Sequence, residues 1–114
     1  VGPAIPPDAR ERVREILSSN PVVEKIVRLR TRMLDTETYR VSADLEFSGK
    51  TLAAKIEPRL SGRFPEIAGH PDFSDFSARF ADCIVEELGD QIDLIEESIQ
   101  KEIPKAHYLD IEAE

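Results

Sequence analysis

Two neighbouring stretches in which apolar and polar residues alternate constrain the fold of this 114-residue chain more than any other feature. In residues 27–33 one face carries Val27, Leu29, Thr31 and Met33, and residues 39–47 carry apolar side chains at every second position. A polar segment at 35–38 separates the two stretches. This pattern predicts an antiparallel hairpin with one buried face and one face in water. The side chains expected on the wet face are Arg28, Arg30, Arg32, Arg40, Ser42, Asp44 and Glu46.

A long amphipathic helix is predicted to follow residue 72. Asp72 is the expected N-cap, because Pro71 disfavours helix upstream, and Pro104 ends the helix. At about 1.5 Å per residue the helix is roughly 45 Å long, which is more than a three-stranded sheet covers. We therefore expect a homodimer that buries the overhanging apolar stripe. The stripe consists of Phe73, Phe76, Phe80, Ile84, Leu88, Ile92, Ile95 and Ile99.

The flanking segments are shorter. Residues 1–7 are proline-rich and predict an extended lead-in. A capping box at residues 8–11 starts a short helix, which ends before Pro21. Residues 50–71, with several prolines and glycines, are expected to form an irregular insertion before the long helix. Within it, residues 51–56 are compatible with a helical turn or a short strand.

A last strand is predicted over residues 106–112. Leu109 and Ile111 would face the core, while Asp110 and Glu112 would share the opposite face. The resulting order α-β-β-α-β predicts a small α+β sandwich of two layers, ferredoxin-like, with one domain over residues 8–114.

Charge and composition exclude several classes of protein. The net charge is −8; residues 1–57 carry ten basic and nine acidic side chains, and residues 58–114 carry five and fourteen. Such acidity disfavours nucleic-acid binding and docking on anionic lipid, and it is compatible with attracting cations or with simple solvation. No apolar run is long enough to span a membrane, and no secretory signal is expected. The single cysteine, Cys83, fits a reducing compartment, and the start without Met suggests a piece of a larger protein.

The order of elements and four local patterns resemble the C-terminal cytoplasmic domain of cation diffusion facilitators, the divalent-cation efflux transporters. The patterns are NPVVEKI at residues 20–26, YRVSADLEF at 39–47, the long acidic helix, and the segment from Ile103-Pro104 to LDIE at 109–112. The turn at 47–49, LGDQID at 88–93 and the long 50–71 segment are most similar to the branch that contains the mitochondrial-type zinc transporter homologues. The resemblance covers nearly the whole chain.

The resemblance implies a regulatory domain, not an enzyme, that follows six transmembrane helices of the same transporter and dimerises on the cytoplasmic side of the membrane. In many members of the family the domain binds zinc or a related ion near the dimer interface. The family's last strand carries His-x-Glu or His-x-Asp, and Asp110 and Glu112 stand at these positions here. Carboxylates alone suit harder ions than zinc, so manganese and iron are alternatives.

Four residues are candidate metal ligands: Asp110, Glu112, His107 and His70. The two carboxylates leave the same face of a strand, as a cation site requires. The competing interpretation is that arginines of the wet face neutralise them through ion pairs across the strands. His107 is equally interpreted as a partly buried edge residue or a contact to a partner chain, His70 as a solvated loop residue, and Cys83 as a small buried side chain.

Three functions follow. The leading one is a metal-responsive dimerisation domain of an efflux transporter, in which an ion between two protomers favours the closed pair and the active transporter. The second keeps the fold without the metal, as a constitutive dimer clamp or a protein-docking module. The third is an acylphosphatase-type hydrolase, which needs a cradle of backbone amides beside an arginine. No glycine-rich loop follows the first predicted strand to build that cradle, and no other catalytic motif is present.

Overall fold

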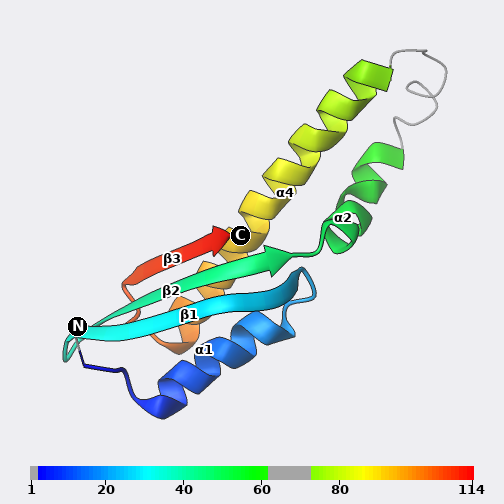
Figure 1. The fold of residues 1–114 in the computed structure, drawn as a ribbon. Helices are drawn as coiled ribbons and strands as arrows, with labels where there is room; N and C mark the ends of the chain where they lie inside the picture. Colours follow the sequence, from blue (N-terminus) through cyan, green and yellow to red (C-terminus); the bar gives the residue numbers. More distant parts are fainter. Residues whose placement is uncertain (1–2, 62–72) are drawn as a thin grey trace.

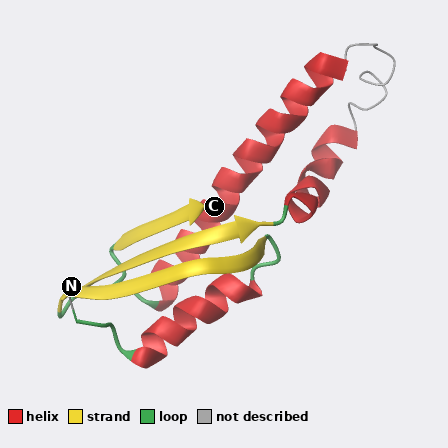
Figure 2. Ribbon diagram, in the orientation of Figure 1, coloured by secondary structure: helices red, strands yellow, loops and turns green. Residues whose placement is uncertain are grey.

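The computed structural model describes residues 3–61 and 73–114. The described elements are α1 (Pro7–Ser19), β1 (Val23–Asp35), β2 (Thr38–Phe47), α2 (Gly49–Ser61), α4 (Phe73–Glu102) and β3 (Tyr108–Ala113). The strands of this part of the chain form a mixed sheet in the order β1-β2-β3, with β1 antiparallel and β3 parallel to β2. Helices α1 and α4 cover one face of the sheet (Figures 1 and 2). The predicted α+β class is confirmed, and the arrangement is consistent with a ferredoxin-like sandwich.

The hairpin forms as predicted, with Asp35 paired to Thr38 across the turn. The Glu37 amide donates a hydrogen bond to the Asp35 carboxylate at 2.8 Å, a local bond that favours the turn. Strand β1 begins four residues earlier than predicted and contains a bulge after Ile26. At this bulge the alternation is interrupted, so that Ile26 packs against the core and Val27 has no partner on β2.

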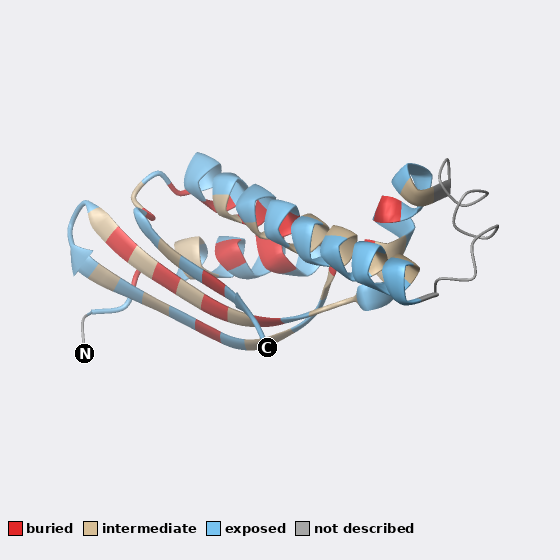
Figure 3. Ribbon diagram, turned by 90° about the horizontal axis from the view of Figure 1, so that it is seen from above, coloured by how far each residue is buried: buried red, intermediate tan, exposed pale blue. Residues whose placement is uncertain are grey.

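The core lies between the helices and the inner face of the sheet (Figure 3). Strand β2 contributes every second side chain, from Tyr39 through Leu45, as its period-two pattern requires. The fully buried side chains Leu17 of α1 and Ile99 of α4 pack against this row. Burial of one such side chain stabilises the fold by about 1.5–3 kcal/mol, so the sandwich depends on these few contacts.

Helix α1 begins at Pro7, two residues earlier than an N-cap at Asp8 predicts, and the capping box at residues 8–11 does not form. Pro6 is the N-cap and supplies no side-chain hydrogen bond, while Asp8 lies in the first turn. Proline suits the first helical position, because the missing N–H would have no helical partner there. The Pro3 carbonyl accepts a hydrogen bond from the Met33 amide at 2.8 Å. Of the predicted lead-in, residues 1 and 2 lie outside the described residues and Pro7 belongs to α1.

Helix α2 corrects the expectation that residues 50–71 are irregular, as far as residue 61. The Ser48 hydroxyl accepts a hydrogen bond from the Thr51 amide at 3.1 Å, which caps the helix. Leu52 and Ile56, one turn apart, are buried, and α2 packs beside α4. Pro58 lies inside the helix. Because proline usually ends a helix, its presence argued against a helix in the sequence. The remainder of the 50–71 segment lies outside the described residues.

Helix α4 begins and ends where the sequence predicts, and its expected N-cap Asp72 lies outside the described residues. Its C-terminal half buries Ile95 and Ile99 against the sheet. Its N-terminal half projects beyond the sheet beside α2, which makes the molecule elongated, 59 × 22 × 20 Å (Figure 1). Phe76 and Phe80 on this projecting part are half-buried, with ring centroids 6.0 Å apart. The burial of the apolar stripe of α4 by a second copy of the chain stays a prediction.

Candidate functional site

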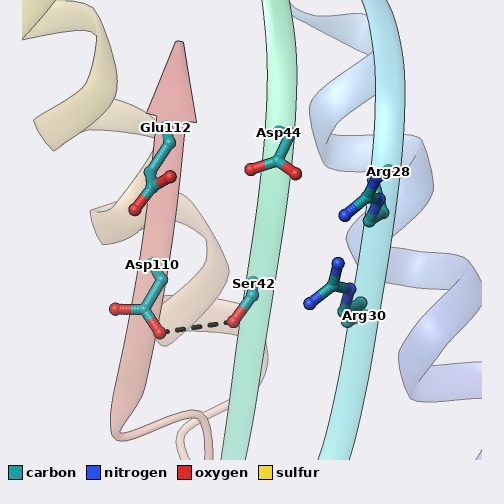
Figure 4. Close-up of a pocket in the computed structure, with 6 residues that line it drawn as sticks. All are labelled: Arg28, Arg30, Ser42, Asp44, Asp110 and Glu112. Atoms are coloured by element: carbon teal, nitrogen blue, oxygen red, sulfur yellow. Dashed lines mark hydrogen bonds between the residues drawn. The ribbon is translucent and has the colours of Figure 1, made fainter. Parts of the chain in front are cut away.

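The face of the sheet turned away from the helices carries the charged residues that the alternation predicts; we call it the open face. Near its middle lies an open hollow of about 270 Å³. All three strands line it, β1 with arginines and β3 with carboxylates (Figure 4). The lining residues are Arg28, Arg30, Ser42, Asp44, Asp110 and Glu112.

The strand register arranges these six side chains in two rows across the sheet. In one row Arg28 faces Asp44, and Asp44 faces Glu112. In the next row Arg30 faces Ser42, and Ser42 faces Asp110. The open face therefore has a basic edge at β1 and an acidic edge at β3.

The expected neutralisation of the carboxylates by arginines is not observed. Within residues 3–61 and 73–114, neither Arg28 nor Arg30 forms an ion pair with a carboxylate. Asp110 instead accepts a hydrogen bond from the Ser42 hydroxyl at 3.2 Å. Asp44 and Glu112 are register partners across β2 and β3, which places two like charges side by side. The hollow thus separates unpaired positive and negative groups.

The negative charge of Asp110 also acts on the helix layer. The pKa of Glu96 on α4 is raised, first by partial burial and then by the charges of Asp93 and Asp110. Removing the negative charge of Asp110 would therefore lower the pKa of Glu96 toward its ordinary value. A cation bound at Asp110 would act in the same direction.

The described oxygen donors of the open face fall short of a metal centre in one chain. Among the described residues, no group of three or more histidine, cysteine, aspartate or glutamate side chains is placed to hold one. Asp110 and Glu112 are both exposed and leave the same face, as predicted. Two carboxylates without a nitrogen or sulfur donor do not make a zinc site, which takes four ligands. A single chain therefore does not complete a metal centre with its described residues.

The other candidate residues lie elsewhere. His107 is exposed and precedes β3, so it is neither partly buried nor part of the hollow. His70 falls outside the described residues. Cys83 is a free, half-buried residue on the projecting part of α4. Of the four predicted ligands, the structure brings together Asp110 and Glu112.

Two further residues of the predicted wet face belong to the same hollow. Asp44 and Ser42 were visible in the sequence only as the wet side of a strand, and the register places them beside β3. At the far end of the open face, the Arg40 guanidinium lies 5.5 Å from the centroid of the Tyr108 ring, a cation–π contact. The Nε atom of Arg40 is buried with no hydrogen-bond partner among the described residues.

A second hollow of about 340 Å³ lies between α1 and α4, with Ile16, Leu94 and Ile95 among its lining residues. Arg12 of α1 and Glu102 of α4 form an ion pair at its rim, with Nη2 and Oε1 2.7 Å apart. The groups that line it include no histidine or cysteine. We assign it no chemistry.

Comparisons with known proteins define the class. The chain is homologous over nearly its whole length, at low identity, to zinc transporters of the cation diffusion facilitator family. This confirms the resemblance drawn from the sequence, and these homologues are transporters rather than enzymes.

Two kinds of similar protein illustrate this homology. One is the mitochondrial proton-coupled zinc antiporter SLC30A9, 21% identical in Xenopus laevis and 22% in Mus musculus over 98% of this chain. The other is metal tolerance protein C4 of Arabidopsis thaliana, 25% identical over 99% of this chain. The chain spans 21% of each antiporter and 26% of the plant protein. No family model and no solved structure matches.

Among the described residues, no helix combines the length and hydropathy that a membrane crossing requires.

Proposed function

We propose that this chain is the regulatory and dimerisation domain of a divalent-cation efflux transporter, on the cytoplasmic side of the membrane. An ion held between two copies stabilises the paired domains, and this pairing favours the active state of the attached transmembrane domain. The homology to zinc transporters supports the setting. Zinc is the first candidate ion, with manganese and iron(II) as alternatives.

The observation that carries the proposal is the pair of unpaired carboxylates on the open face. Asp110 and Glu112 are exposed, lie two residues apart on β3, and have no basic partner within ion-pair distance among the described residues. Asp44, across from Glu112, adds a third negative group. These three carboxylates attract a cation. Within one chain, none of them forms an ion pair with a described basic side chain.

Two copies are needed for two reasons. The described donors of one chain fall short of a metal centre. An ion that bound a single chain would also have the same affinity for separate and paired domains and would shift no equilibrium. The second copy must therefore supply further ligands.

The test is sedimentation velocity combined with thermal unfolding of the chelator-stripped chain, with and without zinc, manganese and iron(II). We expect one ion to raise Tm saturably and to increase the dimer fraction. At about a hundredfold excess over its Kd, a bound ion stabilises the folded state by about 2.7 kcal/mol.

The variant Asp110→Asn/Glu112→Gln should lose this ion response and keep its fold, because both side chains are exposed. Asp82→Asn/Glu86→Gln on the projecting part of α4 is the matched control, with the same charge change at exposed positions. Separate His107→Ala and His70→Ala variants report whether either histidine is a ligand. A chain indifferent to all three ions would overturn the metal-responsive form of the proposal.

One alternative has an observation in its favour. The lack of a third donor in the described part of the chain favours a dimerisation or protein-docking domain of the same fold that works without a metal. A dimer that forms equally well in chelator and in every ion would establish it.

A further inference from the structure

Two arginines lie side by side where the open face meets the hairpin turn; we call this part of the sheet, residues 32–40, the hairpin end. Arg32 of β1 and Arg40 of β2 are register partners, so two like charges adjoin there. Neither forms an ion pair with a described residue. The acidic side chains of the turn have other partners, because Asp35 accepts a hydrogen bond from the Glu37 amide and Glu37 pairs with Lys105 at 3.6 Å. The two guanidinium groups are therefore without a described counter-ion.

Large apolar side chains are exposed beside these arginines. In the described part of the chain, Tyr108 is 51% exposed and Leu34, which precedes the turn, is 42% exposed. The Arg40 guanidinium lies 5.5 Å from the centroid of the Tyr108 ring, and its buried Nε atom has no partner there. A ligand therefore reaches Arg40 through its Nη atoms. A guanidinium fork matches the oxygens of a phosphate group, and a tyrosine suits a boundary between apolar and polar surroundings.

We infer that the hairpin end docks on the headgroups of the membrane. Arg32 and Arg40 bind the phosphate groups of anionic lipid, and Tyr108 and Leu34 enter the headgroup layer beside them. This docking rests on the proposed function at one point, the transmembrane domain that precedes this domain in the transporter. It involves none of the side chains that line the hollow at Asp110.

The segment before α1 turns the hairpin end toward the membrane. The Pro3 carbonyl accepts a hydrogen bond from the Met33 amide at 2.8 Å, so this segment is tied to β1 beside the turn. In the proposed function the transmembrane domain is joined to the same segment. The arm formed by α2 and the projecting part of α4 lies at the opposite end of a molecule 59 Å long (Figure 1). The hairpin end is therefore the part of the sheet nearest to the membrane.

The net charge of −8 by itself disfavours anionic lipid, but the charge is unevenly placed. Exposed carboxylates such as Asp82, Glu86 and Asp90 belong to the projecting part of α4, far from the hairpin end (Figure 1). Salt of 0.1 M screens such charges beyond about 10 Å. Each arginine at an anionic surface contributes about fivefold to the affinity. Two arginines thus bind weakly on their own, and they act when attachment to the transporter already holds the domain at the surface.

The test anchors the chain to vesicles through an N-terminal histidine tag and a nickel-chelating lipid, in place of the transmembrane domain. The chain contains no tryptophan, so Tyr108→Trp introduces a single fluorescent reporter. Bromine-labelled phospholipid quenches this reporter when the ring enters the headgroup layer. We expect quenching on vesicles that contain phosphatidylglycerol and none on vesicles of phosphatidylcholine with the same nickel-chelating lipid.

A second reporter tests the orientation of the domain. Val85→Trp places the tryptophan at an exposed position on the projecting part of α4. It should stay unquenched on both kinds of vesicle, because this part lies at the other end of the molecule (Figure 1). Equal quenching of both reporters would overturn the inference.

Arginine variants in the Tyr108→Trp chain test the phosphate contacts. Arg32→Gln/Arg40→Gln should weaken the contact about 25-fold, which removes the quenching. Lys50→Gln/Lys55→Gln is the matched control, with the same charge change at exposed positions of α2, and should leave the quenching unchanged. Thermal unfolding checks the fold of each variant. Arg32 is exposed, so Arg32→Gln alone provides a second variant, and it should weaken the contact about fivefold.

Three further results would overturn the inference. One is a reporter at residue 108 that stays unquenched on phosphatidylglycerol, and another is quenching that persists in the arginine variants. The third is quenching abolished by inorganic phosphate but not by sodium chloride of equal ionic strength, because the arginines would then bind free phosphate and not a headgroup.

The proposed function is judged separately, by its ion response in solution without vesicles. If an ion raises Tm and the reporter at residue 108 is never quenched, the ion-responsive domain stands and the lipid contact is wrong. If the reporter is quenched as expected and no ion acts, the lipid contact stands and the metal-responsive form of the function is wrong.

Discussion

Ser42 and Asp110 are register partners across the parallel pairing of β2 and β3, and the Ser42 hydroxyl donates a hydrogen bond to the Asp110 carboxylate at 3.2 Å. This bond joins residues 68 positions apart in the chain. It orients one of the two carboxylates on which the proposed function rests. Arg30, the other register neighbour of Ser42, forms no ion pair with Asp110.

Replacing Ser42 by alanine should loosen Asp110 without unfolding the domain. The bond is exposed, so we expect a loss of stability of no more than about 0.5–1 kcal/mol. The affinity of any ion that binds at Asp110 should fall by up to about tenfold, because the carboxylate is no longer oriented. Calorimetric titration measures this, with Ser98→Ala on α4 as control. A loss of stability above ~2 kcal/mol would assign Ser42 a structural role instead.

Neutralising Arg28 and Arg30 should strengthen cation binding at the hollow. Both guanidinium groups line it and repel an incoming divalent ion. The variant Arg28→Gln/Arg30→Gln should bind the ion roughly three- to tenfold more tightly at low salt, and the gain should shrink as salt is added. Arg14→Gln/Lys101→Gln serves as the distant control. An unchanged affinity would place the ion away from the hollow.

Glu96 should destabilise the domain at neutral pH. Its pKa is raised in the folded state, first by burial and then by Asp93 and Asp110, so the folded state holds the proton more tightly than the unfolded chain. Stability therefore falls as the pH rises above the ordinary value of 4.5. Glu96→Gln should raise Tm at pH 7 by roughly 1–3 °C, and the difference should disappear in acid. Glu97→Gln, at an exposed neighbouring position, should show neither effect.

Glu102 should have the opposite pH dependence. The hydrogen bond from Arg12 is the largest cause and lowers the pKa of Glu102, while desolvation of the carboxylate acts in the opposite direction. The contribution of the ion pair is present above the ordinary value of 4.5 and is lost as the pH falls through the lower folded value. Glu102→Gln should therefore reduce Tm slightly at pH 7 and leave it unchanged in acid. A double-mutant cycle with Arg12→Gln isolates the pair, and additive effects would show that it contributes nothing.

Gly89 should be replaceable at a gain in stability. It is exposed in the interior of α4, and a Cβ atom built there meets no atom within 4 Å. Alanine should therefore stabilise the helix by about 0.5–1 kcal/mol, measured by chemical unfolding. Ala81→Gly, at an exposed position of the same helix, should cost a similar amount. A Gly89→Ala variant that is less stable would reveal that the helix must bend at this point.

Local patterns predicted most of the elements. The alternation from Tyr39 to Leu45 and the apolar steps through Ile99 specify a strand and a helix, because one buried face imposes a period of 2 or 3.6 residues. The same reasoning missed α2, where Pro58 stands inside the helix and the burial of Leu52 and Ile56 against α4 offsets it. It also placed Val27 on the inner face, because a bulge leaves no mark in the alternation.

The candidate site was predicted in part. Asp110 and Glu112 were recognised as neighbours because they are two apart on one strand, which is a local property. Asp44 and Ser42 joined them only through the parallel pairing of β2 with β3. The arginines were expected to neutralise these carboxylates and do not, since ion-pair formation depends on side-chain positions that the alternation does not specify.

The sequence by itself determined the wet and buried faces of each strand, the length of α4 and the acidity of the chain, because these depend on composition and on residues a few positions apart. The tertiary structure alone decided which rows meet across the sheet. It brought Arg28 and Glu112, far apart in the sequence, into one row with opposite charges on opposite edges. Strand order and register arise from the packing of the whole core, and a local pattern does not contain them.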